Sequence, residues 1–252
     1  MNVFLKGMAV IIIAAAWGGC EGDYRQGSRG TFGEAVVVMD STQWEGQTAE
    51  AIRETYGRGI FTLPSSGSEP LFDLRFTDFN SDSQLEQVKR ARNLIIAAPI
   101  DDSTNTSRWV RAMLSDEVEE QVRNGESFAF PLQDRWYKNQ WSIILSAPSD
   151  SLLAEQIHNS EKTLTDHLLQ KEFQRWNAEI YEQGEQVELS DSVWANHGWK
   201  IRIQHDWEKN IDTTYTVNGE ENHFLTMRRV LPENNRWFWA WWKNDEIGRA
   251  HV

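Results

Sequence analysis

Three aspartates follow two of the strands that the sequence predicts, and carboxylates in such places can do chemistry. Asp40 ends the apolar run EAVVVMD, and Asp101 and Asp102 follow the run NLIIAAP. If the two runs are parallel neighbours in a sheet, the three carboxylates meet at its carboxyl edge, where α/β proteins tend to build their sites. There they could hold a divalent cation or act as a proton-transfer pair. The competing interpretation is that each aspartate caps the turn or helix that follows its strand.

Other catalytic signatures are missing from the sequence. The histidines at 158, 167, 197, 205 and 223 have no zinc-binding spacing, and none lies in a nucleophile motif such as Gly-x-Ser-x-Gly. We therefore expect a non-enzymatic protein with no cofactor and no bound metal. A carboxylate-based hydrolase on the N-terminal half, with or without a metal ion, is the alternative.

The C-terminal part of the chain is rich in tryptophan. Four of the 13 tryptophans crowd into the stretch RWFWAWW, which begins at Arg236. On a strand, Trp237, Trp239 and Trp241 share one face. One interpretation is a strand that is buried on both faces. The other is a platform that binds a sugar or a partner protein, with Arg236 and Arg229 as its polar edges.

The only cysteine, Cys20, ends the only long apolar run of the chain. Lys6 is the only charge before it, and the uncharged stretch from Gly7 to Trp17 would span about 16 Å as a helix, half of a bilayer's hydrocarbon core. A basic start, a short apolar run and small residues are typical of a secretory signal. An ordinary signal peptide with an incidental cysteine nearby would have the same features.

The tripeptide Gly18-Gly19-Cys20 resembles the lipobox of bacterial lipoproteins, although Trp17 stands where an aliphatic residue is usual. The resemblance implies a signal peptide over residues 1–19, a diacylglycerol on the Cys20 thiol and a place in the bacterial cell envelope. Two or more acyl chains suffice for stable anchoring. Glu21 and Asp23 are a short version of an acidic sorting signal, so we expect the outer membrane, on either its periplasmic or its surface face.

Composition excludes several other classes of function. The net charge is −13, with 38 acidic and 25 basic residues, which argues against nucleic-acid binding and against a polybasic attachment to anionic lipid. One cysteine also excludes an internal disulfide. The membrane, through the lipid anchor, and an envelope protein or glycan are therefore the partners that we expect.

The elements that must position these residues follow from hydrophobic periodicity. Residues 34–99 alternate strand, helix, strand, helix and strand, and residues 114–125 and 141–148 predict a further helix and strand. A long helix is expected over residues 150–183, with a bend at 158–160, and three strands over residues 199–204, 222–231 and 236–242. The sequence thus predicts an α+β fold, with a mixed sheet, helices mainly on one face, and antiparallel C-terminal strands.

The predicted domain organisation has four parts. A glycine-rich tether over residues 20–33 leads into one α+β domain over residues 34–245, which could instead form two subdomains, 34–148 and 149–245. Back-translated, the final EIGRAHV resembles the start of a sequencing adapter. We expect residues 246–252 to be a non-native tail and the chain to be truncated, the alternative being a natural tail.

Four stretches carry a resemblance to a known family. The segments EAVVVMDSTQWEGQTAEAIRETY, EPLFDLRF, RARNLIIAAP and DRWYKNQWSIIL resemble uncharacterised Bacteroidetes-type envelope lipoproteins, which are defined only as a domain of unknown function. The likeness covers most of residues 34–242. It implies a lipid-anchored envelope protein and supplies neither an activity nor a site.

Overall fold

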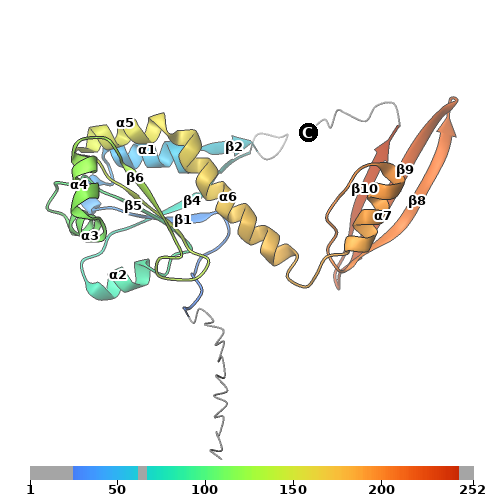
Figure 1. Cartoon of the computed structure of the whole chain (residues 1–252), viewed down its shortest axis with the longest axis horizontal. Coiled ribbons are helices and arrows are strands. Elements are labelled where there is room, and N and C mark those ends of the chain that lie inside the picture. The colour runs from blue at the N-terminus through green and yellow to red at the C-terminus, as the bar shows by residue number, and fades with distance from the viewer. Residues whose placement is uncertain (1–24, 62–66, 244–252) are drawn as a thin grey trace, which may run out of the picture. The chain divides into compact units, whose positions relative to one another are not determined.

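The structure, a computed structural model, describes residues 25–61 and 67–243 (Figure 1). Cys20, the predicted signal peptide and the predicted tail over residues 246–252 lie outside the described residues. Contacts divide the chain into two compact units, Met1–Glu161 and Lys162–Val252. The N-terminal unit holds a mostly parallel sheet, and the C-terminal unit holds an antiparallel one.

Both units of the described chain contain helices and strands. In chain order they are β1 (Glu34–Val38), a 3-10 helix (Ser41–Gln43), α1 (Gln47–Tyr56), β2 (Gly59–Phe61), β3 (Ser68–Pro70), β4 (Asp73–Thr77), α2 (Asp82–Val88), β5 (Asn93–Ala97), α3 (Asn105–Met113), α4 (Asp116–Arg123), β6 (Ala129–Gln133), β7 (Trp141–Leu145), α5 (Asp150–Asn159), α6 (Glu161–Ile180), α7 (Val187–His197), β8 (Trp207–Val217), β9 (Glu220–Val230) and β10 (Asn235–Trp242).

The sheet of the N-terminal unit has five strands in the order β4-β1-β5-β7-β6. β1 pairs in parallel with both β4 and β5, β5 pairs in parallel with β7, and only β6 runs antiparallel to its neighbour. Every residue of the central strands β5 and β7 is buried. Nearly continuous apolar runs rich in isoleucine and leucine are typical of strands covered on both faces. NLIIA and WSIIL are runs of this kind, so they form inner strands of this sheet.

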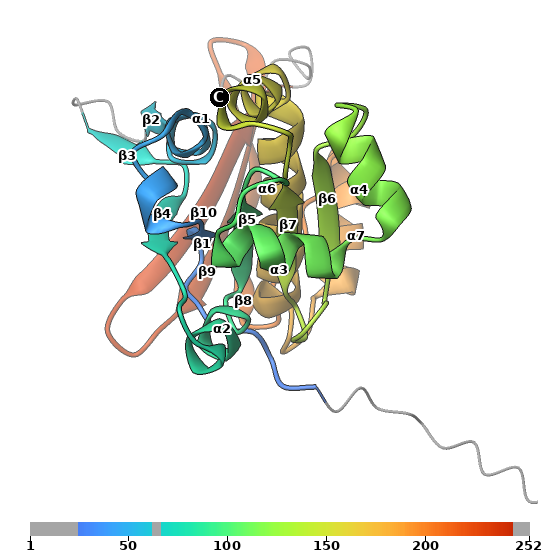
Figure 2. The same cartoon turned by 90° about the vertical axis from the view of Figure 1, so that its left-hand side faces the viewer.

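Helices cover both faces of the five-stranded sheet. Figure 2 shows α1 and α5 side by side on one face, and α3 on the other. On the α3 face, Leu94, Ile96 and Ile144 pack with Val110 of α3 and Val122 of α4. The α+β class, the β-α-β pattern and the C-terminal antiparallel strands are confirmed. The expected placement of helices on mainly one face applies only to the C-terminal sheet.

One aspartate of α5 caps a different helix. The N-cap residue of α1 is a glycine, Gly46, so the helix has no capping side chain of its own. The Asp150 carboxylate instead accepts hydrogen bonds from the backbone N–H groups of Gln47 and Thr48, at 3.0 and 3.2 Å, and the Asp150 carbonyl accepts one from the Thr48 hydroxyl. A Cβ on Gly46 would lie 3.1 Å from this carboxylate. Glycine therefore makes room for a cap that α5 supplies.

Replacing Asp150 by alanine should lower the free energy of unfolding of the N-terminal unit by about 1–2 kcal/mol, because the first N–H groups of α1 lose their acceptor. Asp150→Asn keeps one acceptor oxygen and should lose less. Denaturant unfolding checks this, with Asp73→Ala, at an exposed position on the edge strand β4, as the control. Equal losses for Asp150→Ala and Asp73→Ala would contradict the capping role.

The C-terminal unit is an antiparallel sheet in the order β10-β9-β8, packed on α7. Asn218 and Gly219 join β8 to β9, and both have positive φ, 52° and 83°, as a two-residue hairpin turn of this handedness requires. Gly198 ends α7 in the left-handed conformation, at φ 75°. Figure 1 shows α7 lying along the β8–β10 sheet.

Two expected elements of this part of the chain differ in the structure. The long helix predicted over residues 150–183 is interrupted at Ser160, which separates α5 from α6 at the place where a bend was expected. The strand predicted over residues 199–204 does not form, while β8, which follows it, was not predicted. α7, α3 and β6 were likewise not predicted.

The described part of the predicted tether is bonded to the N-terminal unit. The backbone N–H of Ser28 donates to the carbonyl of Lys138 at 2.9 Å, and that of Arg29 donates to the carbonyl of Arg90 at 2.7 Å. Gly30, at φ 146°, would place a Cβ 3.1 Å from the Cβ of Arg92. From Gln26 onward the chain is therefore held in place before β1 begins.

Candidate binding surface

The three aspartates that could do chemistry each have a separate structural partner. The strands that precede them, β1 and β5, are parallel neighbours, which is the condition under which the three carboxylates could meet. The Asp40 carboxylate caps the 3-10 helix and accepts from the backbone N–H of Thr42 at 3.0 Å and from its hydroxyl at 2.6 Å. The Asp102 carboxylate accepts from the side-chain amide of Gln43. These contacts are those of strand-end turns.

Asp101 is engaged from a helix. The Arg123 guanidinium of α4 donates to its carboxylate at 3.0 Å and also donates to the Glu119 carboxylate, and these two hydrogen bonds raise the pKa of Arg123 above its ordinary value. Among residues 25–61 and 67–243, no group of three or more His, Cys, Asp or Glu side chains is arranged to hold a metal ion. The metal-dependent form of the hydrolase alternative therefore has no ligand group of this kind within the described residues.

The tryptophans of β10 form one exposed face of the C-terminal sheet. Trp237, Trp239 and Trp241 alternate along the strand and retain 52%, 67% and 49% of their surface. Opposite them on β9 lie Arg228, Thr226 and Phe224. Because directly paired residues of antiparallel strands share a face, these side chains extend the tryptophan row across the second strand.

The third strand, β8, continues this face with apolar side chains. Ile211 pairs with Thr226, and Tyr215 pairs with Asn222. Ile211, Tyr215 and Val217 retain 42%, 42% and 46% of their surface. We call the whole set the tryptophan face. It consists of the outward side chains of the three strands: Ile211, Thr213, Tyr215, Val217, Phe224, Thr226, Arg228, Trp237, Trp239 and Trp241.

The opposite face of the same sheet is the core of the C-terminal unit. Leu225 and Met227 of β9 and Val193 of α7 are buried there together with Ile203. Phe238 and Trp242 of β10 pack against this cluster. Because one face buries these side chains under α7, the alternation along β10 directs Trp237, Trp239 and Trp241 away from the core.

The charged groups around the tryptophan face differ from those expected. The Arg228 guanidinium lies 5.9 Å from the ring centre of Trp237, and the Lys243 ammonium lies 6.0 Å from that of Trp241. Arg236 pairs with Arg229, and both lie on the α7 side of the sheet, so neither borders the tryptophan face as proposed from the sequence. The period of two predicts this side for Arg236, which stands next to Trp237.

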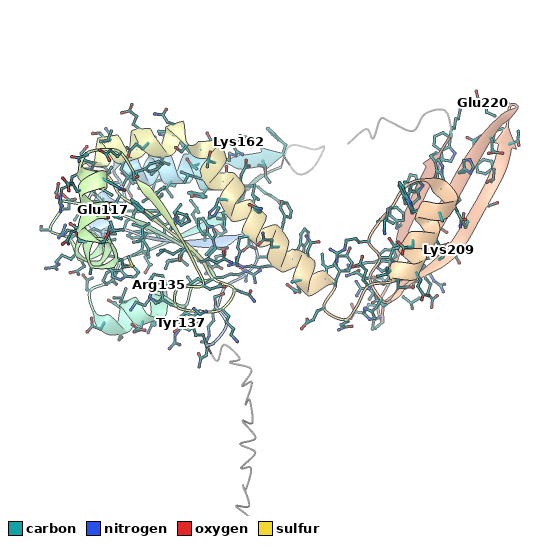
Figure 3. All side chains as sticks on the ribbon, viewed as in Figure 1. Glu117, Arg135, Tyr137, Lys162, Lys209 and Glu220 are labelled. Carbon is teal, nitrogen blue, oxygen red and sulfur yellow. The ribbon has the colours of Figure 1, made fainter. Side chains whose placement is uncertain are left out.

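A charged cluster joins α7 to the sheet. The Asp212 carboxylate lies 3.0 Å from His197 Nε2 and accepts from Lys209 at 3.0 Å. Partial burial raises the pKa of Asp212, but the interactions with Lys209 and His197 lower it by more than burial raises it. The pKa of Asp212 therefore lies below its ordinary value. Figure 3 marks Lys209 on β8 and Glu220 at the tip of the β8–β9 hairpin, where Glu220 pairs with Lys243.

Taken together, the described residues define a two-unit α+β protein with an exposed aromatic sheet face and without a group of three or more His, Cys, Asp or Glu side chains that could hold a metal ion. The chain belongs to the family described as domain of unknown function DUF8532, whose model matches residues 28–181. The match spans the N-terminal unit and α6, and ends before the sheet that carries the tryptophan face. No curated protein and no solved structure matches the chain.

Within residues 25–61 and 67–243, no helix is both long enough and apolar enough to cross a bilayer.

Proposed function

We propose that this protein is a lipid-anchored component of the bacterial envelope, held in the outer membrane through Cys20, and that it binds a partner protein through the tryptophan face without catalysing a reaction. The observation that carries the binding proposal is the exposure of Trp237, Trp239 and Trp241 on a sheet whose other face is packed. Contiguous apolar patches of this kind on soluble units mark interaction sites.

The composition of the tryptophan face favours a protein partner. It combines three tryptophans with Tyr215 and with the aliphatic side chains of Ile211 and Val217. Aromatic residues are enriched at the centres of protein interfaces, and aliphatic side chains gain free energy by burial against a complementary apolar surface. Arg228, beside Trp237, adds a donor of the type that recurs in binding hot spots.

A glycan is the second candidate ligand. Its support is the spacing of the tryptophans, which recur at every second residue of β10 and therefore at about 6.8 Å along the strand. Flat rings in such a row can stack on successive sugars of an extended chain. Envelope glycans, peptidoglycan above all, are polymers of this shape.

The anchoring proposal rests on the sequence around Cys20. A lone cysteine directly after two glycines and a short apolar run is where a lipidated thiol must stand. Expressed in a Gram-negative bacterium, the full chain should be recovered in the outer-membrane fraction and should incorporate a radiolabelled fatty acid. The Cys20→Ala variant should lose the label and leave the membrane fraction. Labelled, membrane-bound Cys20→Ala protein would contradict the proposal.

The tryptophan face can be tested by photo-crosslinking in cells. A photoreactive phenylalanine analogue at position 239 should give one discrete covalent adduct with a protein, and Trp237→Ala with Trp241→Ala should abolish it. The same analogue at position 194 is the matched control, because Trp194 is 57% exposed but lies on α7. Adducts of equal yield at both positions would overturn the proposal. Sedimentation with purified peptidoglycan that depends on the three tryptophans would instead identify the glycan.

A further inference from the structure

A second surface, in the N-terminal unit, has the opposite chemistry. A pocket of about 700 Å³ lies over the edge strand β4, beside α2, and three of the residues that line it are Arg29, Arg75 and Arg90. Ligand pockets commonly have volumes of about 300–1,000 Å³. In a chain of net charge −13, three guanidinium groups around one pocket form a local excess of positive charge.

The sheet topology explains why a pocket opens here. On the face that carries Val36 and Val38 of β1, helices α3 and α4 cover the middle of the sheet. β4 lies at the edge of the sheet, and the seven-residue α2 supplies lining residues to the pocket beside it. Arg75 pairs with Val36 in the register of β1 and β4, so its side chain extends from the part of this face that α2 leaves uncovered.

Backbone hydrogen bonds bring Arg29 and Arg90 to the same place from distant parts of the sequence. The N–H of Arg29 donates to the carbonyl of Arg90 at 2.7 Å, and the N–H of Arg92 donates to the carbonyl of Arg29 at 2.8 Å. Gly30 permits this close approach, because a Cβ at this position would lie only 3.1 Å from the Cβ of Arg92. The two arginines therefore line the pocket because the chain before β1 is bonded to the turn after α2.

The donors of this pocket are largely unused within the protein. The buried Arg90 Nε has no hydrogen-bond partner among the described residues, which is a costly state for a charged group. Within the described part of the chain, no side chain pairs with the Arg29 guanidinium. Arg75 lies 3.3 Å from Glu34 and 3.8 Å from Asp73, both longer than the usual 2.7–2.9 Å of a charge-assisted hydrogen bond.

The acidic group of the pocket is already occupied. The Asp78 carboxylate accepts from the backbone N–H groups of Ser41, at 3.1 Å, and Phe79, at 2.7 Å. Glu34 and Asp73 offset the charge of Arg75, so Arg29 and Arg90 are the lining arginines left to neutralise an anion. A phosphate monoester carries about −1.5 to −2 at neutral pH and offers three acceptor oxygens. Gln84 and Gln87 add amide donors at the same rim, and Val36 and Val88 form an apolar wall.

We infer that this pocket binds a phosphate-bearing ligand, with the phosphate held by Arg29, Arg75 and Arg90 and its carbon part against Val36 and Val88. Two sources supply such a group, a soluble organic phosphate and a phospholipid headgroup. The inference does not depend on lipidation of Cys20 or on the tryptophan face. An anion bound beside Arg90 would give this side chain a partner, which its buried Nε does not have among the described residues.

The test measures binding of glycerol 3-phosphate to the purified full-length Cys20→Ala chain by calorimetry, with glycerol and sodium chloride at equal ionic strength as blanks. Arg90→Gln and Arg29→Gln should each weaken binding about tenfold, since each removes a charge-assisted hydrogen bond. Arg236→Gln is the matched control. Arg236 is exposed and lies on β10, in the C-terminal unit.

A parallel arm separates the two sources of phosphate. Co-sedimentation with phosphatidylglycerol vesicles, compared with phosphatidylcholine vesicles, should show the same dependence on Arg90 if the headgroup is the ligand, whereas binding of glycerol 3-phosphate alone identifies a soluble one. If Arg90→Gln impairs folding, Arg75→Gln carries the test, because the Arg75 side chain is 63% exposed. Equal affinity in wild type, Arg75→Gln and Arg90→Gln, or no binding in either arm, would overturn the inference.

Discussion

Replacing Ile144 by alanine should lower the free energy of unfolding of the N-terminal unit by about 3–4 kcal/mol. Ile144 lies on β7 and is 1% exposed. It pairs with Ile96 of β5 on one side and with Phe130 of β6 on the other, and it packs in the cluster under α3 and α4. Deleting three carbon atoms there removes buried apolar surface. It also leaves a cavity between the sheet and α3 and α4, which the surrounding elements cannot fill completely.

Denaturant unfolding with hydrogen exchange read by mass spectrometry measures this loss unit by unit. Resolution by unit matters because a chain that divides into two units need not unfold in a single step. Ile60→Ala is the matched control, since Ile60 lies on the exposed hairpin strand β2 and keeps 36% of its surface. A loss at Ile144 no greater than that at Ile60 would show that β7 is not at the centre of the sheet.

The middle of this sheet was predictable because its strands are buried on both faces. The runs at Val36–Val38, Leu94–Ala97 and Ile143–Leu145 have no polar alternation to confuse with an amphipathic helix, and each lies in a segment of seven or eight residues that ends at an aspartate or a proline. Ser81 and Ser115, residue types that favour helix starts, cap α2 and α4, and their hydroxyls accept from the backbone N–H groups of Gln84 and Val118. Local signals sufficed wherever local and tertiary preferences agreed.

The stretch Trp199–Gln204 shows why the pattern failed elsewhere. Its alternation reflects burial of Ile201 and Ile203, but its backbone bonds to a helix instead of a strand. The Ile201 carbonyl accepts from the Ser190 hydroxyl at 2.6 Å, and the Ile203 carbonyl accepts from the N–H of Gln186 at 2.8 Å. Alternating burial therefore does not require pairing with another strand when α7 and its N-cap residue supply the hydrogen-bond donors.

β8 was missed because its sequence has few strand signals before the turn. The strand carries Glu208, Lys209 and Asp212 among its first residues, and a register shift at Lys209/Ile211 breaks the period of two. The Asn218-Gly219 turn was the usable signal, because a two-residue turn of this type requires a strand on each side.

The candidate sites were predictable only in part. Asp40 and Asp102 follow strands that are neighbours in the sheet, but carboxylates that cap turns and carboxylates that hold metals look the same in the sequence. The shared face of Trp237, Trp239 and Trp241 follows from strand periodicity, whereas its exposure depends on which face α7 covers. Nothing local marks Arg29 as a neighbour of Arg90, since the backbone bonds that join them link distant segments.

Truncating a side chain to alanine should cost much more stability on one face of the C-terminal sheet than on the other. Leu225→Ala, on β9, should lower the free energy of unfolding of the C-terminal unit by about 3 kcal/mol, because Leu225 is fully buried against α7. Trp239→Ala removes a larger side chain but should change that free energy by less than about 0.5 kcal/mol, because Trp239 is 67% exposed. Denaturant unfolding with hydrogen exchange of peptides from β9 and β10 measures both.

This contrast decides whether the tryptophan face is a free surface. A side chain as large as tryptophan that contributes little to the stability of its own unit, yet keeps half or more of its surface, has its burial still to gain from a partner. Trp242→Ala is the internal control, since Trp242 stands on the same strand but packs against the α7 cluster and should destabilise the unit as Leu225→Ala does. If Trp239→Ala and Trp242→Ala cost the same, the face is covered within the chain itself, and the binding proposal fails.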